Sequence, residues 1–78
     1  MLTCEQIKMA RGALGWSVRK LADASSVGER TIHRIEAQDG LPTATSANLK
    51  LIRETLEAAG IEFIGAPDDG PGVRLWRK

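Results

Sequence analysis

The chain has 78 residues and a formal net charge of +1, with 42% apolar and 27% charged residues. This length and composition fit one small globular domain. No run of about 18 apolar residues offers a membrane span, and Cys4-Glu5-Gln6 interrupts any signal peptide at the start. Because it has no candidate span, we expect the chain to have no membrane partner. A single cysteine cannot form an internal disulfide, so we expect a cytoplasmic protein.

The charges are unevenly distributed along the chain. Residues 1–37 carry six cations and four anions, whereas residues 38–78 carry five cations and six anions. A protein that neutralises phosphates needs local cations rather than a high overall pI. The excess at the N-terminal end is therefore compatible with a polyanionic partner.

Two helices are predicted in the first 25 residues. Thr3 and Gln6 form a capping box, Leu2 can pack on Ile7, and Gly15 stops the first helix. Ser17 then caps a short second helix that runs to about residue 24. A tight turn, Ser25-Ser26-Val27-Gly28, is expected after it.

Two further helices follow this turn. A third helix is predicted from about Glu29 to Gln38, before the breaker Asp39-Gly40-Leu41-Pro42. A fourth begins at Thr43 or Thr45 and ends at Gly60. It places Leu49, Ile52, Leu56 and Ala59 on one face.

The period changes to that of β-strands after Gly60. The runs 61–64 and 73–76 are of β type, and the turn formers GAPDDGPG lie between them. We expect a β-hairpin closed by an eight-residue loop. Because two strands alone are marginally stable, the hairpin must pack on the helices or pair with another chain.

The third helix has two contrasting faces. At 100° per residue, Ile32 and Ile35 point to one side, and Arg30 and Arg34 fall opposite with His33 beside them. Arginine suits guanine edges in the major groove and bidentate contact with phosphate. Ser17 and Gly28 precede helices whose free N–H groups can bind phosphate, and Arg19 and Lys20 are further candidates for phosphate contact.

Together these features resemble a known DNA-binding family. The stretch LGWSVRKLADASSVGERTIHRIEAQ resembles the helix-turn-helix of phage-repressor, Cro-like (xenobiotic-response-element type) proteins. The ending LEAAGIEFIG…GPGVRL resembles small bacterial members with a C-terminal hairpin. The resemblance implies a mainly α fold, a lambda-repressor-like four-helix bundle with a helix-turn-helix over residues 1–60. Residues 61–78 would be a hairpin that packs on it or mediates dimerisation.

The resemblance also implies residue roles. The third helix would enter the major groove of double-stranded DNA, with Glu29, Arg30 and Arg34 at base-reading positions and Thr31 near the backbone. Arg11 would form a partly buried ion pair with Glu36. The implied function is a transcriptional regulator, a repressor, that binds a pseudo-palindromic operator as a homodimer.

The sequence departs from the family pattern in three places. Val18 stands where a phosphate-binding glutamine is frequent, Ser26 replaces the turn glycine, and Ala37-Gln38-Asp39-Gly40 replaces a basic segment. Ser26 must therefore accept an unusual φ or alter the turn. Two opportunities for phosphate contact are missing, which predicts modest DNA affinity.

The sequence offers no catalytic, metal or cofactor motif. It has one histidine, no glycine-rich phosphate loop, and no nucleophile with a matching base, so we expect neither an enzyme nor a bound metal or cofactor. The alternative function is an antitoxin-like or regulatory protein-interaction module with weak DNA binding. Near-neutral charge and an apolar hairpin with Trp76 favour a protein partner.

Overall fold

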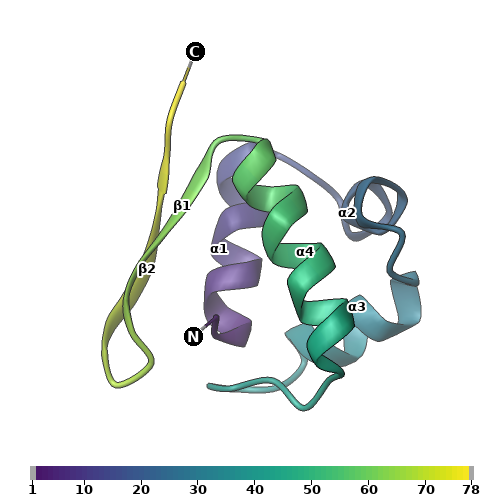
Figure 1. Ribbon diagram of the computed structural model, residues 1–78, viewed down its shortest axis with the longest axis horizontal. Helices are drawn as coiled ribbons and strands as arrows, with labels where there is room; N and C mark the ends of the chain where they lie inside the picture. Colours follow the sequence, from purple (N-terminus) through teal and green to yellow (C-terminus); the bar gives the residue numbers. More distant parts are fainter. Residues whose placement is uncertain (1, 78) are drawn as a thin grey trace.

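The computed structural model describes residues 2–77 and contains four helices followed by an antiparallel hairpin (Figure 1). The elements are α1 (Cys4–Leu14), α2 (Val18–Ser25), α3 (Glu29–Glu36), α4 (Ser46–Ala58), β1 (Ile61–Ala66) and β2 (Asp69–Leu75). The hairpin lies beside α1, and α2 and α3 lie on the opposite side of the molecule (Figure 1). No helix within residues 2–77 is long and apolar enough to cross a bilayer.

Helix ends follow the predicted caps. The Thr3 side chain accepts from the backbone of Gln6, whose side chain accepts from the Thr3 backbone, so the capping box is present. Gly15 ends α1 with a φ of +69°. Thr45, rather than Thr43, caps α4 because its hydroxyl accepts from the backbone of Asn48.

α3 is shorter than predicted, because it ends at Glu36 and not at Gln38. Contacts of the following loop with α1 explain the early end. The backbone N–H of Cys4 donates to the Gly40 carbonyl at 2.8 Å, and the Gly40 N–H donates to both carboxylate oxygens of Glu5 at 3.1 Å. The chain must leave the helical path to reach α1.

The predicted eight-residue loop of the hairpin is wrong. The two strands continue through most of it, Ala66 pairs with Asp69, and only Pro67 and Asp68 form the turn. Gly65 makes this possible, since its φ is +79° and a Cβ there would lie 2.4 Å from the Gly70 carbonyl oxygen. The second strand ends at Leu75, one residue before its predicted end, so Trp76 lies just after β2.

One core joins the helices and the hairpin. Its buried apolar side chains are Leu2, Cys4, Ile7, Ala10, Leu21, Ala22, Val27, Ile32, Ile35, Ile52, Leu56 and Ile61. Phe63, Val73 and Leu75 on the hairpin pack against this set. The hairpin therefore contributes one face to the core and leaves the other to solvent.

Gln6 fastens the hairpin to α1. Its side chain is fully buried, and its Nε2 donates to the carbonyl oxygens of Ile64 (3.0 Å) and Gly72 (2.9 Å), one on each strand. Its Oε1 is already used by Thr3. Every polar atom of this buried amide thus has a partner within residues 2–77, and no buried side-chain N or O in that range lacks one.

Candidate nucleic-acid interface

The turn between α2 and α3 is built around Ser26. This residue ends α2 with a φ of +64°, and it is the non-glycine residue with positive φ within residues 2–77. Its N–H donates to the Ala22 carbonyl at 2.9 Å. Ser25 turns back to accept from the Val27 N–H at 3.2 Å, and both of these side chains are buried. Ser26 therefore adopts the left-handed conformation that glycine would adopt without strain, and the turn keeps its shape without a glycine.

α3 presents a buried face and a solvent face. Ile32 and Ile35 are fully buried, and Arg30, His33 and Arg34 are exposed. Ile32 and Ile35 are the fully buried side chains of α3 and pack it on the core. The two faces predicted from the spacing are therefore present.

The predicted DNA-binding residues lie on α2 and its N-cap Ser17, in the turn, and on α3. Thr31 is half-buried, and the others are exposed: Ser17, Arg19, Lys20, Gly28, Glu29, Arg30, His33 and Arg34. The exposed set contains four Lys or Arg side chains and one carboxylate. Tertiary folding thus leaves this cationic group accessible to a large ligand.

The arginines of α3 have no internal partners. The ion pairs within residues 2–77 involve Arg11, Arg53 and Arg74, and neither Arg30 nor Arg34 takes part in one. Lys20 is partly engaged, since its Nζ lies 5.6 Å from the centroid of the Trp16 ring. The guanidinium groups of α3 therefore keep all their donors for a ligand.

The two helix starts differ in the donors they offer. Ser17 accepts a hydrogen bond from the Lys20 N–H at 3.0 Å, which uses one of the free N–H groups of α2. Gly28 begins α3 without any side-chain cap, so the first-turn N–H groups of α3 stay open. These open N–H groups and the positive end of the helix dipole favour an anion, although Glu29 in the same turn already supplies one negative charge.

Arg11 and Glu36 fix the far end of α3. The Arg11 guanidinium donates from Nε to Oε2 at 2.9 Å and from Nη2 to Oε1 at 2.7 Å, and its Nη1 donates to the Trp16 carbonyl. The hydrogen bond to Glu36 raises the pKa of Arg11 above its usual range, against a smaller opposing effect of burial. The ion pair implied by the resemblance is therefore present and ties α3 to α1.

Gln38 is a residue of this region that the sequence did not single out. Its Nε2 donates to the Arg34 carbonyl, and its Oε1 accepts from the Thr43 N–H at 2.8 Å. The amide thus holds the last turn of α3 to the loop that leads to α4. A glutamine just after a helix is too common to signal such a bridge in advance.

Metal-ligand geometry is missing from the described part of the chain, where no three His, Cys, Asp or Glu side chains come together. No protein-family model matches the sequence, and no curated protein matches it either. Assignment of a function therefore depends on the geometry of α2, the turn and α3.

Proposed function

We propose that the protein is a sequence-specific DNA-binding transcriptional regulator with a lambda-repressor-like helix-turn-helix. In this proposal α3 is the recognition helix, and a dimer reads a pseudo-palindromic operator. Bound at a promoter, such a dimer acts as a repressor by occupying the DNA. No cofactor is needed.

The observation that carries the proposal is the unpaired cationic face of α3. Arg30 and Arg34 are exposed and free of internal ion pairs, and the buried Ile32 and Ile35 hold the helix on its opposite side. A rigid helix that offers two bidentate donors one turn apart suits guanine edges and phosphates of the major groove.

The electrostatic setting supports modest rather than tight affinity. Arg19 and Lys20 add cations at the start of α2, but Glu29, Asp23 and Asp39 lie exposed on the same segment or just after it. Few phosphates would be neutralised, so base contacts must supply much of the discrimination.

The test begins by selecting duplex DNA from a randomised pool with the purified protein. Fluorescence anisotropy then compares the selected duplex with a scrambled one over a salt series. We expect log K to fall with log[salt] with a slope of about −0.9 for each neutralised phosphate. Replacing Arg34 by alanine should weaken binding to the selected duplex by about 1–3 kcal/mol and relax the preference at one base position.

Arg53→Ala is the matched control. Arg53 is also an exposed arginine, but it lies on α4 and pairs with Glu57 at 3.2 Å. Its removal should leave the base preference unchanged. Selection that returns no enriched sequence, or equal effects of both substitutions on the preference, would contradict the proposal.

One observation favours the second candidate, an antitoxin-like or regulatory protein-interaction module. Trp76 is 58% exposed on the open side of the hairpin, where its Nε1 donates to Glu62 and the Arg74 guanidinium lies 5.5 Å from its ring. Exposed tryptophan is typical of protein interfaces. This candidate predicts salt-independent or absent DNA binding together with a stable complex that Trp76→Ala disrupts.

A further inference from the structure

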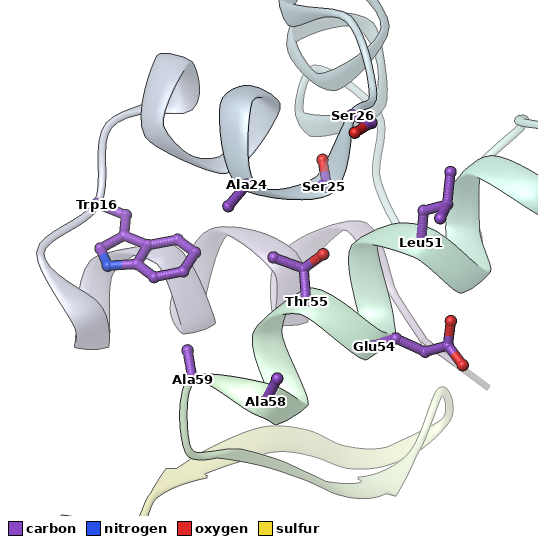
Figure 2. A pocket seen from close by; sticks show the side chains of 9 residues that line it. All are labelled: Trp16, Ala24, Ser25, Ser26, Leu51, Glu54, Thr55, Ala58 and Ala59. Atoms are coloured by element: carbon purple, nitrogen blue, oxygen red, sulfur yellow. The ribbon is translucent and has the colours of Figure 1, made fainter.

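A hollow of about 580 Å³ lies between α2 and α4 (Figure 2). Trp16 stands at one end, and Leu51 and Glu54 stand at the other. Small side chains form the floor between them, among them Ala24, Thr55 and Ala58. We call this surface the α2/α4 hollow.

Leu51, at one end of the hollow, is an exposed apolar side chain of α4. Leu51 is 41% exposed although Ile52 and Leu56 on the other side of α4 are fully buried. Ala47, Thr55 and Ala58 lie on the same side of α4 at helical spacing, so Leu51 stands out among small side chains on what we call the second face of the helix. Within residues 2–77 this second face has no element packed over Leu51.

The two ends of the hollow complement one another. The Trp16 end carries a positive charge, because Lys20 lies over the indole ring. The other end carries the negative charge of Glu54 beside Leu51, and Glu54 forms no ion pair within residues 2–77. The two ends of the hollow therefore carry opposite charges, and the exposed Leu51 side chain stands at the negative end.

We propose that a second copy of the chain docks on the α2/α4 hollow about a two-fold axis that passes near Thr55. Such an axis sets each end of the hollow against the opposite end of the partner copy. Leu51 then enters the partner's small-residue floor beside Trp16, and Glu54 approaches Lys20. The contact is isologous, so one surface supplies both the protruding side chain and the space that receives it.

A second copy that docks on the α2/α4 hollow covers a sizeable part of this small chain. A standard interface buries about 800 Å² on each partner, which is about one sixth of the 4756 Å² accessible surface of this chain. Two half-sites on one DNA duplex would also hold two copies close together, which adds to the contact between them.

Sedimentation velocity over a protein concentration series, without DNA, tests the proposal. Wild-type protein should show a concentration-dependent monomer–dimer equilibrium, and Leu51→Ala should weaken it by about tenfold or more. Leu41→Ala is the control, because Leu41 is 49% exposed in the loop before α4 and lies outside the hollow. Its dimerisation should stay within about twofold of wild type. A wild-type chain that stays monomeric, or equal effects of both leucine changes, would overturn the proposal.

Charge reversal locates the partner surface. Glu54→Lys and Lys20→Glu should each weaken dimerisation, and the double variant should recover most of the loss, which simple surface damage would not do. Thr55→Cys should form a disulfide between copies under mild oxidation, whereas Lys50→Cys should not. Failure of the double variant to recover, or equal cross-linking at both positions, would contradict the two-fold arrangement.

The inference builds on the proposed regulator by naming the surface through which two copies meet. Its tests use no DNA, so each idea can fail without the other. Normal selection of DNA by a Leu51→Ala protein that dimerises like wild type would refute only the docking surface. A hollow-dependent dimer that selects no DNA would refute only the regulator.

Discussion

Arg11 on α1 and Glu36 at the end of α3 are joined by two parallel hydrogen bonds across 25 residues of sequence. The Glu36 side chain is 9% exposed and that of Arg11 is 24% exposed, so the pair is largely withdrawn from water. The position of the solvent face of α3 therefore depends on an electrostatic contact with α1, in addition to the burial of Ile32 and Ile35.

Removing one partner of this pair should be costly. We expect Glu36→Ala to lower the free energy of unfolding by about 2 kcal/mol, because Arg11 keeps its charge without its carboxylate partner. Urea unfolding followed by circular dichroism gives the value. Glu57→Ala, which breaks the exposed pair with Arg53, should cost less than about 0.5 kcal/mol. Equal losses in the two variants would show that the Arg11–Glu36 contact adds nothing special.

Gln6 should tolerate almost no substitution, because its Nε2 donates to a carbonyl on each strand. Glutamate has the same size but only acceptor oxygens when ionised. We expect Gln6→Glu to cost about 3 kcal/mol at neutral pH and to expose the hairpin amides to hydrogen exchange. Gln38→Glu, a partly exposed glutamine after α3, is the control with a smaller expected loss. Unchanged protection of the hairpin in Gln6→Glu would refute the assigned bridging role.

The left-handed conformation of Ser26 predicts a stabilising substitution. Ser26→Gly should raise the free energy of unfolding by about 0.5–1 kcal/mol, since glycine adopts a φ of +64° without strain. Gly15→Ala makes the opposite change at a φ of +69°, where no atom would clash with the new Cβ, and should lower stability by about 1 kcal/mol. Thermal and urea unfolding of both variants measure the pair. The same sign for both changes would contradict the strain argument.

Glu5 should make stability depend on pH. Hydrogen bonds from its own backbone N–H and from that of Gly40 hold the pKa of its carboxyl below the ordinary value. A lowered pKa in the folded state stabilises the protein above the unfolded pKa, and that contribution is lost as pH falls through the folded pKa. Urea midpoints between about pH 7 and about pH 3 should therefore decline less in Glu5→Gln than in wild type. An identical decline in both proteins would assign the acid sensitivity to other carboxylates.

Most of the helical part could be predicted from residues that lie close together in the sequence. Thr3, Ser17 and Thr45 cap helices because a side-chain oxygen meets a free N–H within three residues, an interaction that sequence spacing reveals. Burial of Ile32 and Ile35 likewise follows from helical periodicity. Contacts within one helix depend on neighbours in the chain, so they can be read without knowing the rest of the fold.

The hairpin is the part of the fold where local sequence signals gave a wrong prediction. GAPDDGPG is rich in turn formers and so predicts an eight-residue loop, yet only Pro67 and Asp68 form the turn. The pairing of the remaining residues depends on the positive φ of Gly65 and Gly70 and on the close approach of their backbones. Glycine permits a loop and a twisted strand equally, and only the partner strand selects between them.

By itself, the sequence determined the caps of the helices, the inward isoleucines of α3, the exposed arginines opposite them, and the need of the hairpin for a packing surface. Only the tertiary structure decided that Gln6 donates to a carbonyl on each strand. It also decided that Glu5 accepts from the Gly40 N–H, in the loop that follows the early end of α3. The hollow between the small side chains of α2 and α4, with Leu51 at one end, likewise exists only in the folded chain. The physical reason is the range of the interactions. Caps and amphipathic faces arise within a few residues, whereas a bridging amide or a hollow exists only after segments distant in sequence have been packed together.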